Sequence, residues 1–199
     1  MTAALQKPNL LDDMQDLTVD DLASLPEDLR YELIDGRLIL PSPTGLHQLL
    51  GVELMLMLRP NCLPDYAPII DLSLNIDRRN EPRPDVVVVH QRYMTRTPVP
   101  VDGALLVVEI ISPTSHFRDM HAKTKIYAEA GVGTYWIVDP TFAGGVMLTE
   151  FRVGDDDEYE MVTSTNKVFE TDTPYPVKID LPALTELRDQ YSKAEESGS

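Results

Sequence analysis

Continuous apolar runs alternate with longer helical stretches along the middle of the chain. Val86-Val-Val-Val89, residues 104–111 and residues 134–139 have the length and the composition of strands buried on both faces of a sheet. Residues 46–58 are rich in Leu and Met and stop before a proline, which is typical of a helix. A second helix is predicted from residue 112 to about residue 130, where glycines follow.

The two ends of the chain show antiparallel patterns. Residues 31–34 and 37–40 are strand-like and are joined by Asp35-Gly36, the dipeptide best suited to the tight turn of a β-hairpin. Residues 146–179 predict further antiparallel strands around an acidic run. The remaining predicted elements are a short helix at 18–26, a strand near 69–76 and a short helix at 182–191.

This order of elements predicts an α+β (α/β) fold with a mixed central β-sheet flanked by helices, an N-terminal hairpin and C-terminal antiparallel strands. A length of 199 residues suits one domain. We place this domain at residues 17–190, between a disordered N-terminal segment at 1–16 and a flexible tail at 191–199.

The charge of the chain is strongly negative but unevenly spread. The formal net charge of −16 argues against a protein that binds nucleic acid through its overall charge. Residues 1–30 carry a net charge of −5 and residues 149–199 one of −8, which leaves −3 for residues 31–148. Within that middle part, residues 78–96 form a basic flank beside Asp85. Such a flank is more often a solvated polar loop, and the alternative is a track for phosphates. Its arginines are Arg78, Arg79, Arg83, Arg92 and Arg96.

Cysteine content and hydropathy indicate the compartment. Cys62 is the single cysteine, so the chain can form no internal disulfide and no paired-thiolate zinc site. The N-terminal residues have no apolar core of a signal peptide, and no apolar run has the length of a membrane span. We therefore expect a soluble cytoplasmic protein without a membrane segment.

Two acidic residues interrupt the apolar strands. Asp85 opens the run at 86–89, and Glu109 lies inside the run at 104–111. An ionised carboxylate buried there costs on the order of several kcal/mol unless it is paired. If the two strands are neighbours, the carboxylates offer the oxygen ligands that Mg²⁺ or Mn²⁺ prefers, and such a metal can activate water against a phosphodiester. The alternative is a pair of structural carboxylates bonded to backbone N–H groups or to an arginine.

Lys123 lies on the helix that follows Glu109. Its spacing with Asp119 and Tyr127 places the three residues on one face, so all three could turn toward the same cleft. The lysine could then stabilise charge on a phosphate, or orient and deprotonate water. The plain alternative is a surface Asp–Lys pair, which would stabilise the helix by a few tenths of a kcal/mol, about 0.3–0.5.

Several strings of residues occur in a distinctive order. They are Tyr31-Glu-Leu-Ile-Asp-Gly36, His47, Pro84-Asp85-Val-Val-Val, Val108-Glu-Ile-Ile-Ser-Pro-Thr114, Asp119-x-x-x-Lys123-x-x-x-Tyr127 and Tyr135-Trp-Ile-Val-Asp-Pro140. Together they resemble the Uma-two family of restriction-endonuclease-like proteins, within the PD-(D/E)xK nuclease superfamily. The resemblance spans about residues 17–185, most of the chain.

The resemblance implies a restriction-endonuclease-like core that hydrolyses nucleic acid, DNA in the first instance, with Mg²⁺ or Mn²⁺, typically as a homodimer. Asp85 and Glu109 match the motif acids and are the implied metal ligands. Ile111 occupies the position where the motif lysine is expected. The resemblance therefore implies that Lys123 on the following helix takes over that role.

Glu32 and His47 also fall on family positions near the site. The resemblance makes Glu32 a further ligand or a carboxylate beside the ligands, whereas a hairpin glutamate more often faces solvent. It makes His47 a group that orients the phosphate or a water, whereas a histidine at a helix start can equally be a cap or a semi-buried structural residue.

Two functions follow from these observations. The first is a metal-dependent endonuclease in which Asp85 and Glu109 hold the ion and Lys123 assists. The second is a nuclease-fold protein with weak or no catalysis that serves as a dimeric binding or scaffolding module, which the missing motif lysine and the acidic charge support.

Overall fold

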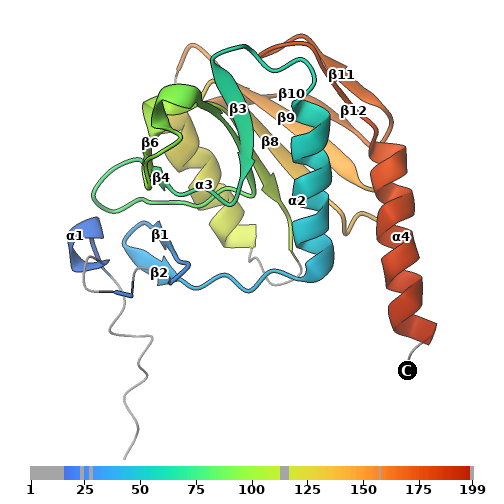
Figure 1. The fold of residues 1–199 in the computed structure, drawn as a ribbon, viewed down its shortest axis with the longest axis horizontal. Helices are drawn as coiled ribbons and strands as arrows, with labels where there is room; N and C mark the ends of the chain where they lie inside the picture. The colour runs from blue at the N-terminus through green and yellow to red at the C-terminus, as the bar shows by residue number, and fades with distance from the viewer. Residues whose placement is uncertain (1–15, 23–24, 27–28, 113–116, 157, 198–199) are drawn as a thin grey trace, which may run out of the picture.

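The protein is built around one six-stranded β-sheet, seen in Figure 1 in a computed structural model that describes residues 16–22, 25–26, 29–112, 117–156 and 158–197. The strand order across the sheet is β10-β9-β8-β7-β5-β3. These strands are β3 (Tyr66–Ile70), β5 (Val86–His90), β7 (Ala104–Ile110), β8 (Thr134–Asp139), β9 (Met147–Val153) and β10 (Tyr159–Thr165). The predicted α+β fold with a mixed central sheet is confirmed.

The sheet is mixed because one central pair of strands is parallel. Strands β7 and β8 run parallel, with Glu109 opposite Ile137, and every other pair of neighbours is antiparallel. The parallel pair needs a crossover connection, which the helix α3 (Phe117–Glu129) supplies. Gly131, with a φ of +77°, ends this helix in the left-handed conformation that glycine adopts without strain.

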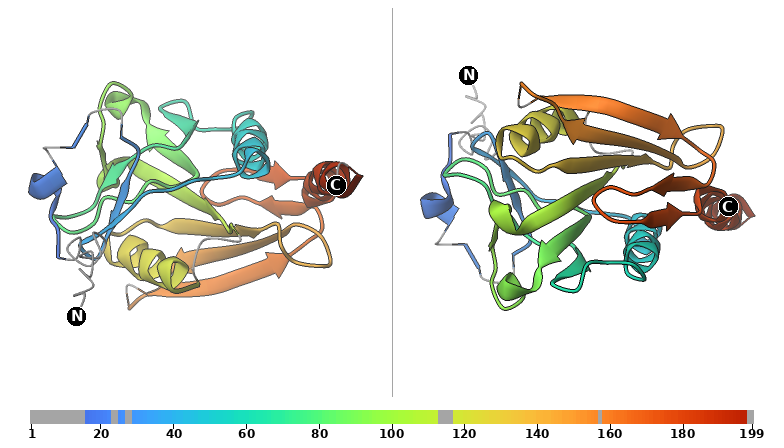
Figure 2. Two further views of the ribbon diagram at one scale, coloured as in Figure 1. Left: turned by 90° about the horizontal axis from the view of Figure 1, so that it is seen from below. Right: turned by 90° about the horizontal axis from the view of Figure 1, so that it is seen from above.

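Different elements cover the two faces of the sheet, as Figure 2 shows. On one face, α2 (Gly45–Leu58) packs with the hairpin of β11 (Phe169–Thr171) and β12 (Val177–Ile179) and with α4 (Leu181–Ser197) over the larger core cluster. On the other face, α3 contributes Tyr127 to a second apolar cluster. Alternate residues of β7 therefore enter different cores, Val108 under α2 and Val107 under α3.

The predicted N-terminal hairpin is present as β1 (Glu32–Ile34) and β2 (Arg37–Ile39). Asp35 and Gly36 have φ values of 51° and 75°, as a type I′ turn requires. The hairpin is fixed to the domain because Leu33 exchanges both backbone hydrogen bonds with Glu81, at 3.1 and 2.8 Å. This pairing orients the neighbouring Glu32, which is 7% exposed.

The structure corrects two element predictions. The strand predicted near 69–76 is divided, because Asp71 adopts a φ of 53° that ends β3 before β4 (Leu74–Asn75) begins. The C-terminal helix predicted to end near 191 continues to Ser197, beyond the predicted domain boundary at 190. Residues 1–15 of the predicted disordered segment (1–16) lie outside the described residues, as do residues 113–115 of the predicted helix start (112–115).

The remaining elements are short. They are α1 (Val19–Leu22), β6 (Val99–Pro100), which pairs with β4, and the 3-10 turns η1 (Gln91–Tyr93) and η2 (Val101–Gly103). In α1 the Asp21 carboxylate accepts the Thr18 N–H at 2.8 Å, as in a capping box. Among the described helices, none is long and apolar enough to cross a membrane.

Candidate active site

The two predicted metal ligands lie side by side on neighbouring strands. The antiparallel register of β5 and β7 pairs Val86 with Val108, so Asp85 and Glu109 come next at the same end of the pair. The Oδ2 atom of Asp85 accepts the backbone N–H of Ile110 at 2.7 Å. One of the two Asp85 oxygens therefore makes the backbone hydrogen bond that the alternative, a structural carboxylate, predicts.

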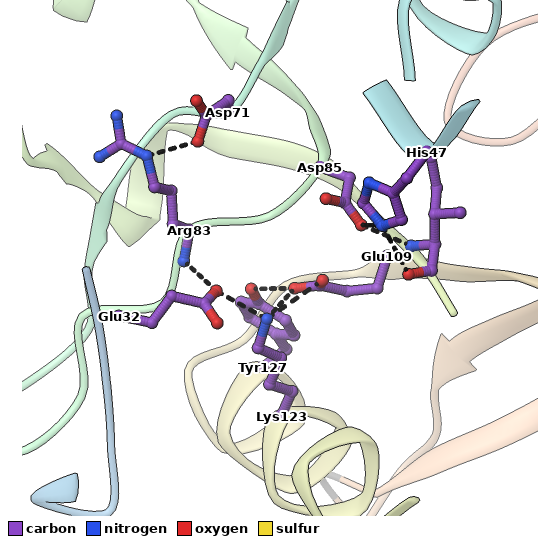
Figure 3. A network of polar contacts seen from close by, with 9 residues as sticks. Glu32, His47, Asp71, Arg83, Asp85, Glu109, Lys123 and Tyr127 are labelled. Carbon is purple, nitrogen blue, oxygen red and sulfur yellow. Dashed lines mark hydrogen bonds and ion pairs between the residues drawn. The ribbon is translucent and has the colours of Figure 1, made fainter. Parts of the chain in front are cut away.

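Glu109 meets two side chains of α3. Its Oε2 accepts from Lys123 Nζ at 3.1 Å, and its Oε1 accepts from the Tyr127 hydroxyl at 2.9 Å (Figure 3). Lys123 is 7% exposed, so the alternative of a surface Asp–Lys pair is wrong for this lysine. The side chain of Asp119, the third residue of the predicted helix face, lies outside the described side chains.

Glu32, from strand β1 of the hairpin, is the second glutamate that contacts Lys123. Its Oε1 accepts from Lys123 Nζ at 2.7 Å and from the backbone N–H of Arg83 at 2.9 Å. The alternative of a solvent-facing hairpin glutamate is wrong, because the side chain is buried against α3. Lys123 thus bridges two glutamates, one from the hairpin and one from the central strand (Figure 3).

His47 reaches the site from the start of α2. Its Nε2 lies 3.1 Å from the carbonyl oxygen of Ile110 and 3.4 Å from Asp85 Oδ2. Because a carbonyl only accepts, Nε2 carries the hydrogen of this bond. The N-cap of α2 is Thr44, whose hydroxyl accepts the His47 N–H at 3.2 Å. The imidazole is thus a neighbour of Asp85, and the capping role belongs to Thr44.

Burial and like charges set the protonation of the acids. Burial raises the pKa of Asp85 to about 7, although the Ile110 N–H and Lys123 oppose the shift. Burial raises the pKa of Glu109 to about 8 against the pull of Lys123, with Asp85 and Glu32 adding to the shift. Burial disfavours the charged form of Lys123, yet Glu109 and Glu32 together raise its pKa above the usual value. The site therefore contains more carboxylate than its lysine neutralises.

All five predicted site residues line one cavity of about 430 Å³. They are Glu32, His47, Asp85, Glu109 and Lys123, and they come from the hairpin, two helices and two strands of the sheet. A cavity of this size admits a small ligand or one unit of a polymer. The structure thus brings together the five residues that the sequence predicts for the site.

The chemistry of the acids suits a divalent cation. Among the described residues, no three His, Cys, Asp or Glu side chains already surround a point where a metal could lie. The buried Glu109 and the partly exposed Asp85 nevertheless supply oxygen donors, and Oδ1 of Asp85 has no hydrogen-bond partner in the described part of the chain. A bound cation would also favour the ionised form of both acids, whose pKa burial raises.

The basic flank does not form a continuous track. Arg78, Arg79 and Arg92 pair with exposed aspartates on the surface, Asp20, Asp16 and Asp102. Arg83 alone of the flank lines the site cavity. The solvated-loop alternative therefore holds for most of the flank and not for Arg83.

Sequence reasoning missed two residues of the cavity wall, Arg30 and Asp71. Asp71 pairs through one carboxylate oxygen with Arg83 and through the other with Arg30. Asp71 also donates its backbone N–H to the carbonyl of Asp85 at 3.1 Å. Neither residue has a local signal in the sequence, because Asp71 reaches the site only through the pairing of β3 with β5.

A mixed sheet with two acids at neighbouring strands and a buried lysine from the crossover helix is the arrangement that the resemblance to restriction-endonuclease-like proteins implies. Residues 15–181 match the family Uma2, described as "Putative restriction endonuclease". The chain belongs to this family, as the motifs of the sequence predict.

The fold has a counterpart among solved structures. A crystal structure from Anabaena variabilis, described as "a putative nuclease belonging to DUF820", superposes with a TM-score of 0.68 and 17% sequence identity. The similarity covers 86% of this chain and 99% of that one. A comparison with curated proteins gives no match.

Proposed function

We propose that the protein is a divalent-metal-dependent endonuclease that hydrolyses phosphodiester bonds of nucleic acid, DNA in the first instance. The observation that carries this proposal is the convergence of Glu32, His47, Asp85, Glu109 and Lys123 on one cavity. Membership of a restriction-endonuclease family supports the same class of reaction.

Asp85 and Glu109 would hold Mg²⁺ or Mn²⁺, which supplies an activated water and shields the charge of the phosphate when bound. The raised pKa of Lys123 keeps its ammonium protonated, so this residue acts as a cation that stabilises charge on the phosphate and not as a base. His47 donates to the Ile110 carbonyl beside Asp85 and positions that end of the site. Glu32 holds Lys123 in place at 2.7 Å.

A dimer is part of the proposal. Two copies of the site would act on the two strands of a duplex, as expected for a restriction-endonuclease-like protein. Light scattering coupled to size-exclusion chromatography measures the mass in solution, and a value near the 22.3 kDa of one chain would argue against the dimer.

A second candidate function is a binding module with feeble catalysis. The observation that favours it is that Lys123 already contacts both Glu32 and Glu109, so a metal has to compete with an ammonium for the Glu109 oxygens. In that case the protein would bind metal weakly and cleave nothing.

Cleavage of supercoiled plasmid, single-stranded DNA and RNA with Mg²⁺ or Mn²⁺ separates the two candidates. We expect metal-dependent cleavage by the wild type and a loss of at least ~100-fold in Asp85→Asn, the size of effect that damage to a metal site has. Asp102→Asn is the control, because this aspartate pairs with Arg92, is 64% exposed and does not line the cavity.

Calorimetric titration of Mg²⁺ accompanies the cleavage assay. A folded wild type that binds Mg²⁺ and cleaves no substrate would favour the binding module. Equal cleavage by the wild type and Asp85→Asn would refute the proposed site.

A further inference from the structure

Two arginines on the cavity wall stand apart from the metal ligands. Arg83 and Arg30 both line the cavity, and the Asp71 carboxylate lies between them, with Oδ1 toward Arg83 Nε and Oδ2 toward Arg30. The Arg83 side chain is 23% exposed and that of Arg30 is 65% exposed. Arg83 therefore lies deeper in the cavity wall, and Arg30 lies nearer to the solvent.

Arg83 has hydrogen-bond donors that Asp71 does not engage. Asp71 engages Arg83 only through Nε. None of the described residues accepts a hydrogen bond from its two terminal nitrogens. Figure 3 shows the guanidinium beside Asp71, turned away from Lys123. A guanidinium presents its donors in a planar fork that matches the oxygens of a phosphate.

Backbone hydrogen bonds fix this group to the catalytic residues. Arg83 donates its N–H to Glu32 at 2.9 Å, and Asp71 donates its N–H to the carbonyl of Asp85 at 3.1 Å. The arginines thus have a set position relative to the reacting centre. A surface ion pair of long side chains has no such attachment.

The charge of the cavity depends on these arginines. Among the described residues, the ionisable groups that line the cavity besides His47 are three cations, Arg30, Arg83 and Lys123, and four carboxylates, Glu32, Asp71, Asp85 and Glu109. Fully ionised, they carry a net charge of −1, which one divalent cation changes to +1. Without the two arginines the metal-loaded cavity would remain at −1 and would repel a phosphodiester.

We infer that Arg83 and Arg30 form a binding site for a phosphate adjacent to the scissile one, with Asp71 as the residue that positions both guanidinium groups. This inference rests on the proposed nuclease function and names the part of the nucleic acid that the cavity wall recognises. Because the contacts go to a phosphate, the site holds the strand in register and reads no base.

The test is binding of a fluorescein-labelled oligonucleotide, single-stranded or duplex DNA, measured by anisotropy over a range of KCl concentrations. Ca²⁺, which takes the same oxygen ligands, replaces Mg²⁺, and gel electrophoresis checks that the probe stays intact. We expect Arg83→Gln and Arg30→Gln each to weaken binding about tenfold and to reduce the slope of log K against log salt by about 0.7–0.9. Arg83→Lys keeps the charge and therefore the slope, but loses the fork and part of the affinity.

Arg92→Gln is the matched control, since Arg92 also pairs with an aspartate, is 55% exposed and does not line the cavity. Its affinity and salt slope should equal those of the wild type. Thermal melting and Mg²⁺ titration of each variant check the fold and the metal site. If Arg83→Gln fails to fold, the more exposed Arg30→Gln provides the result.

The outcomes separate this inference from the proposed function. A wild type that cleaves, together with folded arginine variants of unchanged affinity and slope, would overturn the phosphate site and leave the nuclease proposal intact. A wild type that binds Mg²⁺ but neither binds nor cleaves any oligonucleotide would overturn both.

Discussion

Two buried glutamates of the central sheet, Glu109 on β7 and Glu150 on β9, have very different surroundings. Glu150 is 1% exposed and accepts two hydrogen bonds from Arg152, at 3.1 and 3.0 Å, on the face of the sheet covered by α2. Glu109 is 4% exposed on the other face, where it shares Lys123 with Glu32 and adjoins Asp85. One glutamate has a cation of its own, whereas the other competes for one.

The difference between Glu150 and Glu109 indicates how a buried acid that only stabilises the fold can be distinguished from one in a candidate site. The Glu150–Arg152 pair balances charge within itself, and Arg152 is 37% exposed, so water completes its hydration. The acids at the site exceed their cation. Burial raises the pKa of Asp85 and Glu109, and repulsion from the neighbouring acids adds a smaller part. An excess of this kind destabilises the empty site and is relieved by a proton or a metal ion.

The largest expected effect follows removal of the cation from each region. Lys123→Met leaves Glu32 and Glu109 buried without a counter-ion, which should lower the free energy of unfolding by about 3–5 kcal/mol at pH 8 without metal. Arg152→Met should cost only about 1–3 kcal/mol, because water can reach Glu150 where the half-exposed arginine was. Urea unfolding measures both, and equal losses would contradict the comparison.

A pH dependence of the stability should come from Asp85 and Glu109, the two carboxyls whose pKa burial raises. Asp85 and Glu109 have pKa values of about 7 and about 8 in the folded protein, against ordinary values of 3.8 and 4.5. The folded state therefore holds more protons than the unfolded chain between these limits. The free energy of unfolding without metal should fall as the pH rises from about 4 to 8, by up to about 1.4 kcal/mol per pH unit for each carboxyl.

Thermal melting in EDTA from pH 4 to pH 8 measures this dependence. Glu109→Gln should flatten the decline, because this substitution removes one of the two carboxyls with a raised pKa. Mg²⁺ should raise the melting temperature of the wild type more at pH 8 than at pH 5, because the metal needs the ionised acids. A flat profile for the metal-free wild type would show that neither acid has a raised pKa in the folded protein.

The smallest expected effect follows the removal of a single tyrosine hydroxyl on either face of the central sheet. Tyr127→Phe removes the donor to Glu109, which should cost about 1–2 kcal/mol and raise the pKa of Glu109 further. The acid limb of the pH–rate profile should then move to higher pH. Tyr175→Phe removes a hydroxyl that donates to the carbonyl of Leu58 at 3.0 Å on the opposite face, and should change stability without moving the profile.

Local sequence determined the hairpin and the two principal acids. Asp35-Gly36 specifies its turn because few other dipeptides adopt positive φ at both positions without strain. Asp85 and Glu109 were recognisable because an acid in a continuous apolar strand violates the local pattern, and such a violation needs a partner. The ordered motifs then predicted the family to which the chain belongs.

The tertiary structure alone decided which groups meet. A period of two assigns Glu109 to one face of β7, but the packing of α3 selects Lys123 and Tyr127 as its partners. Glu32 is buried only because the hairpin pairs with residue 81. Arg83 looks like its four neighbours in the basic flank, and its contacts with Asp71, 12 residues away, and with Glu32, 51 residues away, place it at the site. Contacts of this kind depend on strand register and helix packing, which short windows of sequence do not encode.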